Sequence, residues 1–153
     1  MPLQYLCLSL KKGAWKMGNI KSKKLTVLLV DDEDRFREAL SRQLSVRGFN
    51  VLSAANGEDA VKMVHNNAID VTILDQKMPG MGGTQTFNEI KKIDPLIEII
   101  MLTGQATVDD ALEIMKQGAF DYIMKPMTID ELLFKIEDAY TRKVLMEKKN
   151  QKK

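Results

Sequence analysis

The sequence predicts an α/β domain in which helices cover both faces of a parallel β-sheet. Four short runs of mostly apolar and β-branched residues are typical of buried strands, and they lie at residues 25–30, 71–74, 97–102 and 120–124. Segments with helical spacing separate these runs. Each run stops at a polar residue, and in such sheets ligands bind outside the carboxyl ends of the strands. We therefore expect one polar site at one edge of one sheet.

The first half of the domain alternates strand and helix. After the strand at 25–30, residues 34–47 place Phe36, Leu40 and Leu44 on one face of an amphipathic helix. Gly48 suits the left-handed position that ends a helix. Residues 49–54 predict a weaker strand near a sheet edge. A second helix is expected at 58–66, and its inward residues are Ala60, Val61 and Val64.

The second half repeats this alternation between its three strands. Breaker residues bound a helix at 84–92, and Gly118 ends another at 107–117, whose apolar residues are Val108, Ala111, Leu112 and Met115. Thr128 is placed to cap a last helix, with an acid three residues later at Glu131. Its apolar stripe consists of Ile129, Leu132, Leu133, Ile136 and Tyr140, and Val144 keeps the spacing. This helix is therefore expected to continue past residue 140.

Composition predicts one soluble domain. The chain has 153 residues, 44% of them hydrophobic and 29% charged, and no apolar run approaches the roughly 18 residues of a membrane span. A single cysteine, Cys7, excludes an internal disulfide and a multi-cysteine metal cluster. The basic residues near the N-terminus follow its apolar stretch, the reverse of a secretory signal. We expect a cytoplasmic protein without membrane contact.

The net charge of +2 conceals an asymmetry. Residues 1–24 contribute +6 and residues 141–153 contribute +5, which leaves −9 on residues 25–140. Basic ends are able to bind nucleic acid or an acidic partner, but short lysine-rich ends are more often solubilising tails. We interpret 1–24 as a flexible basic extension and 141–153 as a basic tail that continues the last helix. No nucleic-acid contact is expected.

Acidic residues gather at the ends of two predicted strands. Residues 31–34 are all acidic, and Asp75 follows a different buried strand. Residues 31–34 alone would fit ordinary acidic capping of a helix N-terminus. Together with Asp75, they would repel one another at a dry sheet edge unless a cation joined them. A few carboxylates suit Mg²⁺, which also accepts phosphate oxygens.

Asp75 has the context of a nucleophile. A carboxylate can attack phosphorus to form an aspartyl phosphate when the surrounding charge is neutralised. Lys125 offers a positive charge and Thr103 a hydroxyl donor at two further strand ends. Alone, each of these two residues is more often a turn or a local cap. Their joint placement favours a phosphoryl site.

Four motifs carry a family resemblance. Val30-Asp-Asp-Glu33, Leu74-Asp-Gln-Lys-Met-Pro-Gly80, Leu102-Thr-Gly104 and Lys125-Pro126 resemble the receiver domain of bacterial two-component response regulators in order, placement and separation. The resemblance covers residues 25–140. It implies a flavodoxin-like (βα)5 three-layer sandwich with a parallel sheet of order 2-1-3-4-5.

The resemblance also implies roles for individual residues. Asp75 would be the phosphoacceptor, with Thr103 and Lys125 bonding phosphoryl oxygens. Mg²⁺, or Mn²⁺ in its place, would be held by Asp32, Asp75 and the Lys77 backbone carbonyl, and by Asp31 through water. Tyr122 falls at the position of the family's switch aromatic.

The expected function is that of a phosphorylated switch and not of an enzyme. A histidine kinase or a phosphotransfer protein would phosphorylate Asp75. The altered output surface would comprise helix 107–117, strand 120–124 and the helix after Thr128, and its partner would be a downstream protein or a second copy of the chain. The length predicts a stand-alone regulator or a part cut from a longer one.

Two other classes of protein are alternatives to this function. An aspartyl-phosphate phosphatase would need a second acid two residues after its nucleophile, where this chain has Lys77. A flavin or nucleotide carrier would need a phosphate-binding loop after the first strand, where the acidic cluster would repel phosphate. Both are disfavoured.

Overall fold

The fold is a five-stranded parallel sheet between two layers of helices. The computed structural model describes residues 24–104 and 107–152, so the predicted extension at 1–24 and Cys7 fall almost wholly outside the described residues. The strands are β1 (Thr26–Val30), β2 (Asn50–Ala54), β3 (Val71–Asp75), β4 (Glu98–Thr103) and β5 (Asp121–Met124). Their order is β2-β1-β3-β4-β5, and every neighbouring pair is parallel. The predicted fold class and strand order are confirmed.

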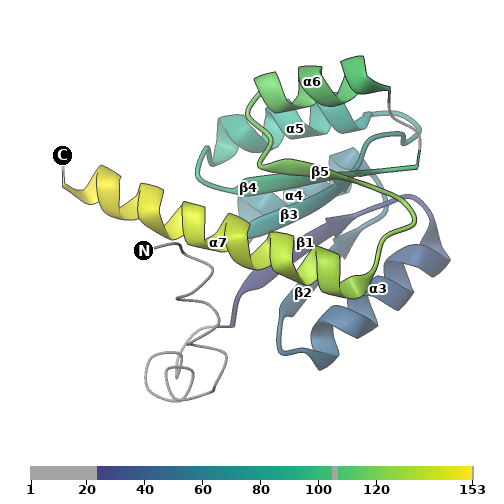
Figure 1. The fold of residues 1–153 in the computed structure, drawn as a ribbon, viewed down its shortest axis with the longest axis horizontal. Helices are drawn as coiled ribbons and strands as arrows, with labels where there is room; N and C mark the ends of the chain where they lie inside the picture. Colours follow the sequence, from purple (N-terminus) through teal and green to yellow (C-terminus); the bar gives the residue numbers. More distant parts are fainter. Residues whose placement is uncertain (1–23, 105–106, 153) are drawn as a thin grey trace.

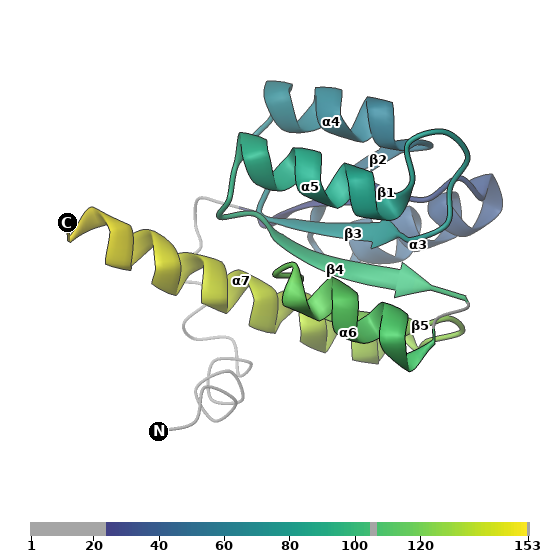
Figure 2. The same cartoon turned by 90° about the horizontal axis from the view of Figure 1, so that it is seen from above.

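Helices on the two faces of the sheet enclose two separate cores (Figures 1 and 2). The helices are α3 (Asp34–Val46), α4 (Gly57–Asn66), α5 (Gly83–Ile93), α6 (Val108–Lys116) and α7 (Ile129–Gln151). Buried residues of α4, α5 and α6 share one core cluster with the sheet, and those of α3 and α7 share the other. The central strands β1 and β3 are buried throughout, as expected for strands covered on both faces.

The predicted element boundaries lie within one or two residues of the observed ones. The small shifts matter at two places, because Asp75 and Thr103 are the last residues of β3 and β4 and not the first residues after them. Gly48 and Gly118 have φ angles of +96° and +105°, so both adopt the left-handed conformation expected after a helix. Strand β2 is at an edge of the sheet, as predicted.

Helix α6 buries few of its apolar residues. Ala111 and Ile114 are the buried residues of this helix. The other apolar residues singled out from the sequence are exposed: Val108 by 74%, Leu112 by 54% and Met115 by 40%. The short edge strand β5 offers α6 only a narrow surface to cover, so most of its apolar stripe faces outward.

Helix α7 runs for 23 residues and begins at the predicted cap. Thr128 accepts a hydrogen bond from the Glu131 backbone N–H. A capping box with both of its hydrogen bonds is present at the start of α6, between Thr107 and Asp110. Figure 2 shows the C-terminal part of α7 extending beyond the end of the sheet. No helix among the described residues has the length and apolar character needed to cross a membrane.

Polar contacts attach the second half of α7 to the sheet. The buried Lys143 ammonium lies 2.8 Å from Oδ1 of buried Asp70, the residue before β3, and 3.1 Å from the Glu147 carboxylate. The other Asp70 oxygen accepts the Thr26 backbone N–H at 2.9 Å. Arg142 pairs with Glu98 at the start of β4. These contacts lie at the amino end of the strands, opposite the acidic cluster.

Candidate functional site

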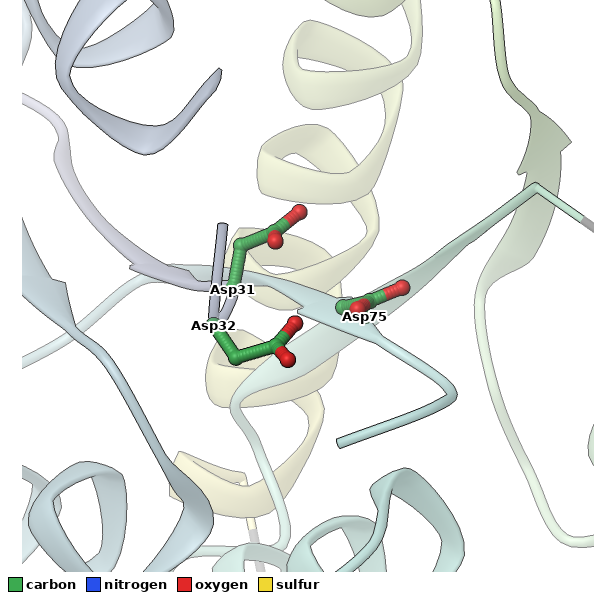
Figure 3. Close-up of side chains that lie close together, drawn as sticks. All are labelled: Asp31, Asp32 and Asp75. Atoms are coloured by element: carbon green, nitrogen blue, oxygen red, sulfur yellow. The ribbon is translucent and has the colours of Figure 1, made fainter. Parts of the chain in front are cut away.

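Three carboxylates meet at the carboxyl edge of the sheet. Asp31 and Asp32 follow β1, Asp75 ends β3, and these two strands are neighbours in the sheet. One carboxylate oxygen from each residue lies within 4.8 Å of the others. Figure 3 shows the Asp31 and Asp32 carboxylates extending toward the side on which Asp75 lies. Asp31 and Asp75 are buried, whereas Asp32 is exposed.

Lys125 supplies the positive charge of this cluster. Its ammonium is 2.7 Å from Oδ2 of Asp31 and 3.8 Å from Oδ1 of Asp75. The Lys125 backbone N–H donates to the Thr103 carbonyl at 2.7 Å, which holds the residue beside the end of β4. The structure thus brings together Asp31, Asp32, Asp75 and Lys125, as the sequence predicted.

Burial and neighbouring charge perturb the Asp75 carboxyl group. Its pKa is raised to about 6, chiefly by burial and also by the charges of Asp31 and Asp32, while the Lys125 ammonium and the Gln76 N–H oppose the shift. Three crowded carboxylates, two of them buried, fit a divalent cation, because a cation relieves both the mutual repulsion and the cost of burying charge. Asp32 and Asp75 have the ligand type that Mg²⁺ prefers.

Asp31 has both of its oxygens engaged. Oδ1 accepts the Glu33 backbone N–H at 2.9 Å, and Oδ2 accepts from Lys125. Arg37 donates to the Asp31 backbone carbonyl at 2.6 Å, so this residue is also fixed through its main chain. Such fixation is typical of a side chain that orients its neighbours.

Phe36 belongs to the site, although its helical spacing predicts only a place on the apolar face of α3. The Lys125 ammonium lies 4.3 Å from the centroid of the Phe36 ring, within the distance of a cation–π contact. Helical spacing places Phe36 on the inward stripe of α3 and carries no sign of a cation. Only the packing of the first turn of α3 against the segment after β5 reveals this contact.

Three predicted residues are placed near the site without a tested role. Thr103 is buried at the end of β4 and pairs in register with Met124 of β5. Tyr122 is partly buried against the core cluster that the sheet shares with α4, α5 and α6. Lys77 is exposed in the loop after β3. The coordination by Lys77 and the switch of Thr103 and Tyr122 stay predictions.

Comparison with known proteins identifies the family. The sequence model described as response regulator receiver domain matches residues 27–137. The chain belongs to this receiver family. The match runs from the second residue of β1 to Glu137 in the first half of α7, and it contains Asp31, Asp32, Asp75 and Lys125.

Curated relatives contain the receiver domain as one part of a longer protein. The chain is 37% identical over 120 residues to a cyclic di-GMP phosphodiesterase of Thermotoga maritima, covering 78% of this chain and 32% of that protein. It is also 37% identical over 106 residues to the regulatory protein AtoC of Escherichia coli, covering 69% and 23%. The chain therefore spans less than a third of the length of these relatives.

Solved structures of separate receiver domains match along nearly their whole length. A receiver domain protein from Clostridium thermocellum is 37% identical with a TM-score of 0.76, covering 80% of this chain and 98% of that one. A CheY-like receiver domain protein from Methanospirillum hungatei is 27% identical with a TM-score of 0.77, covering 81% and 99%. The receiver fold thus accounts for most of the described residues.

Proposed function

We propose that this receiver domain accepts a phosphoryl group on Asp75 from a histidine kinase or a phosphotransfer protein. The observation that carries the proposal is the buried Asp75 carboxylate, which lies beside two further carboxylates and 3.8 Å from the Lys125 ammonium. With a pKa of about 6, Asp75 is mainly ionised near neutral pH and available as a nucleophile.

In the transfer step, an Asp75 carboxylate oxygen bonds to phosphorus. The bond from phosphorus to the donor nitrogen of phosphohistidine breaks, and its electron pair returns to the imidazole. Lys125 moves from Asp31 toward a phosphoryl oxygen, and the Thr103 hydroxyl donates to another. Bound Mg²⁺, or Mn²⁺, would neutralise the carboxylates and bind a phosphoryl oxygen.

The ligand set of this ion is part of the proposal. Asp32 and Asp75 would bind it directly with the Lys77 backbone carbonyl, and Asp31 would act through water. The two occupied oxygens of Asp31 support this division, because Glu33 and Lys125 already bond to them.

Phosphorylation would then alter a surface. Movement of Thr103 toward the new phosphoryl charge would let Tyr122 turn inward, and the output face would be α6, β5 and α7. The exposed apolar residues of α6 support this choice. A downstream protein or a second copy of the domain would bind there.

The acceptor is tested by labelling with acetyl phosphate and Mg²⁺ followed by intact-protein mass spectrometry. The wild type should gain one phosphoryl group, and Asp75→Asn should gain none. Glu33→Gln, which removes a carboxylate outside the three-residue cluster, should be labelled like the wild type. Undiminished labelling of Asp75→Asn would reject the assignment.

A further inference from the structure

The ammonium of Lys125 has three close neighbours, and one of them is aromatic. It lies 2.7 Å from the Asp31 carboxylate and 3.8 Å from the Asp75 carboxylate. Its distance to the centroid of the Phe36 ring is 4.3 Å. The Lys125 side chain is 20% exposed, so little water remains to solvate its charge.

The Phe36 ring is a rigid platform. Phe36 is in the first turn of α3 and packs against the core cluster shared by α3 and α7. Lys125, in contrast, carries its charge on a flexible four-carbon stem and follows the end of β5. The geometry therefore fixes the ring and leaves the ammonium free to shift across its face.

The cation–π contact of Lys125 differs from its ion pairs with Asp31 and Asp75, because it can persist during phosphoryl transfer. Asp31 and an incoming phosphoryl group compete for the same N–H donors of Lys125. A ring attracts the positive charge through its quadrupole and does not need to be exchanged for an oxygen acceptor when the oxygen partner of the ammonium changes. Phe36 can thus keep Lys125 near the acceptor while the ammonium exchanges one oxygen partner for another.

We propose that Phe36 is a positioning residue, which holds the Lys125 ammonium beside Asp75 by a cation–π contact during phosphoryl transfer. This inference rests on the proposed function. It adds a role for an apolar residue of α3, whose side chain has no group that could bind the metal ion or accept the phosphoryl group.

The main test replaces the electrostatics of the ring and keeps its shape. Phenylalanine at position 36 is exchanged for 4-fluoro-, 3,5-difluoro- and 3,4,5-trifluorophenylalanine, which progressively weaken the negative ring face. The rate constant for labelling by saturating acetyl phosphate should fall at each step and reach roughly a three- to tenfold loss. Equal rates along the series would overturn the proposal.

Simple variants give a second test. Phe36→Leu should lower the same rate constant by about three- to tenfold, and Phe36→Tyr, which restores a ring face, should recover most of it. Phe49→Leu is the matched control, because Phe49 packs against the same core cluster as Phe36. An equal loss in Phe49→Leu would assign the effect to packing and contradict the proposal.

A spectroscopic readout needs neither metal nor phosphoryl donor. The ring current of Phe36 should shift the side-chain protons of Lys125 upfield in the metal-free protein, and Phe36→Leu should abolish this shift. Mg²⁺ affinity should change less than about twofold, since Phe36 offers no oxygen ligand to the ion. An unshifted Lys125 in the wild type would refute the contact.

The outcomes separate the two proposals. If wild-type protein is not labelled at Asp75, the proposed function fails. If wild-type protein is labelled and the fluorinated series is labelled equally fast, the role of Phe36 fails alone.

Discussion

The Asp75 carboxyl group opposes folding wherever it is ionised. Its pKa is about 6 in the folded protein and 3.8 without the fold, chiefly because of burial. Well below pH 3.8 the group is protonated in both states and contributes nothing. As pH rises to 6 and beyond, ionisation favours the unfolded chain, by about 3 kcal/mol at the limit.

Asp75→Asn should therefore stabilise the metal-free protein in a pH-dependent way. We expect a gain of roughly 1 to 3 kcal/mol in the free energy of unfolding at pH 7.5 and only about 0.5 kcal/mol or less near pH 4. Urea denaturation with a chelator present at both pH values measures it. Asp34→Asn, at an exposed position of the same acidic run, should gain far less. A gain that does not depend on pH would contradict this account.

A second prediction for single residues concerns the binding of Mg²⁺ by its expected ligands. Asp32→Ala should weaken Mg²⁺ binding by at least about tenfold, because its carboxylate belongs to the three that converge. Glu33→Ala should leave the dissociation constant nearly unchanged. Titration of amide NMR shifts with Mg²⁺ compares the two variants. Equal losses would show that general negative charge, and not ligation by Asp32, holds the ion.

At the level of elements, β4 and β5 would connect the proposed acceptor to the proposed output face. Thr103 and Met124 pair in register, and Tyr122 lies two residues earlier on β5. Thr103→Ala should leave Asp75 open to beryllofluoride with Mg²⁺, yet shrink the amide shift changes in α6 and β5, because the hydroxyl that responds to the new charge is gone. Identical shift changes in wild type and variant would place the coupling elsewhere.

The attachment of α7 to the sheet makes a second prediction at this scale. Hydrogen bonds from Lys143 to Asp70 and Glu147 outweigh the desolvation that lowers its pKa, so the pKa of Lys143 is raised and the charged form stabilises the fold at neutral pH. Lys143→Met should lower the free energy of unfolding by about 3 kcal/mol or more at pH 7, because buried Asp70 loses its partner.

The same change on the exposed side of α7 serves as the control. Lys148→Met should alter stability by less than about 0.5 kcal/mol. Adding Asp70→Asn to Lys143→Met should recover part of the loss, since the buried carboxylate charge that Lys143 balanced is then removed. Chemical denaturation of the four proteins decides the point, and equal losses at positions 143 and 148 would refute the buried pair.

Whether a contact can be predicted from the sequence depends on what brings its residues together. Strand ends in a parallel sheet meet at one edge, so Asp31, Asp32, Asp75 and Lys125 were predictable as one site. The cation–π contact of Phe36 was not, because helical spacing assigns an apolar residue to a face and says nothing of the charge beside it. The exposure of Leu112 was also missed, since it depends on how much sheet lies beneath α6.

At the scale of the whole molecule, the exposed apolar residues of α6 matter because the domain that contains them carries a strong negative charge. Residues 25–140 carry −9, which disfavours contact between two copies. Val108, Leu112 and Met115 nevertheless offer an apolar surface on α6, and Met124 of β5 is 42% exposed. Association of two phosphorylated domains through α6, β5 and α7 would bury this surface.

Leu112→Glu should prevent such association. Sedimentation velocity with beryllofluoride and Mg²⁺ should show a dimer for the wild type and a monomer for the variant, because the substitution places a charge in the apolar contact. Val46→Glu, at an 84% exposed residue of α3 on the opposite layer, is the control and should still dimerise. Dimerisation of Leu112→Glu would exclude this face.

The pairing of Lys143 with Asp70 also sets the rotational phase of α7. A helix turns by about 100° and rises about 1.5 Å per residue, so one residue inserted after Tyr140 would carry the ammonium away from its buried partner and rotate everything beyond it by the same angle. An insertion of seven residues would return the phase to within about 20°. The direction in which the end of α7 presents its side chains is thus tied to the sheet by the Lys143–Asp70 pair and by the neighbouring Arg142–Glu98 pair.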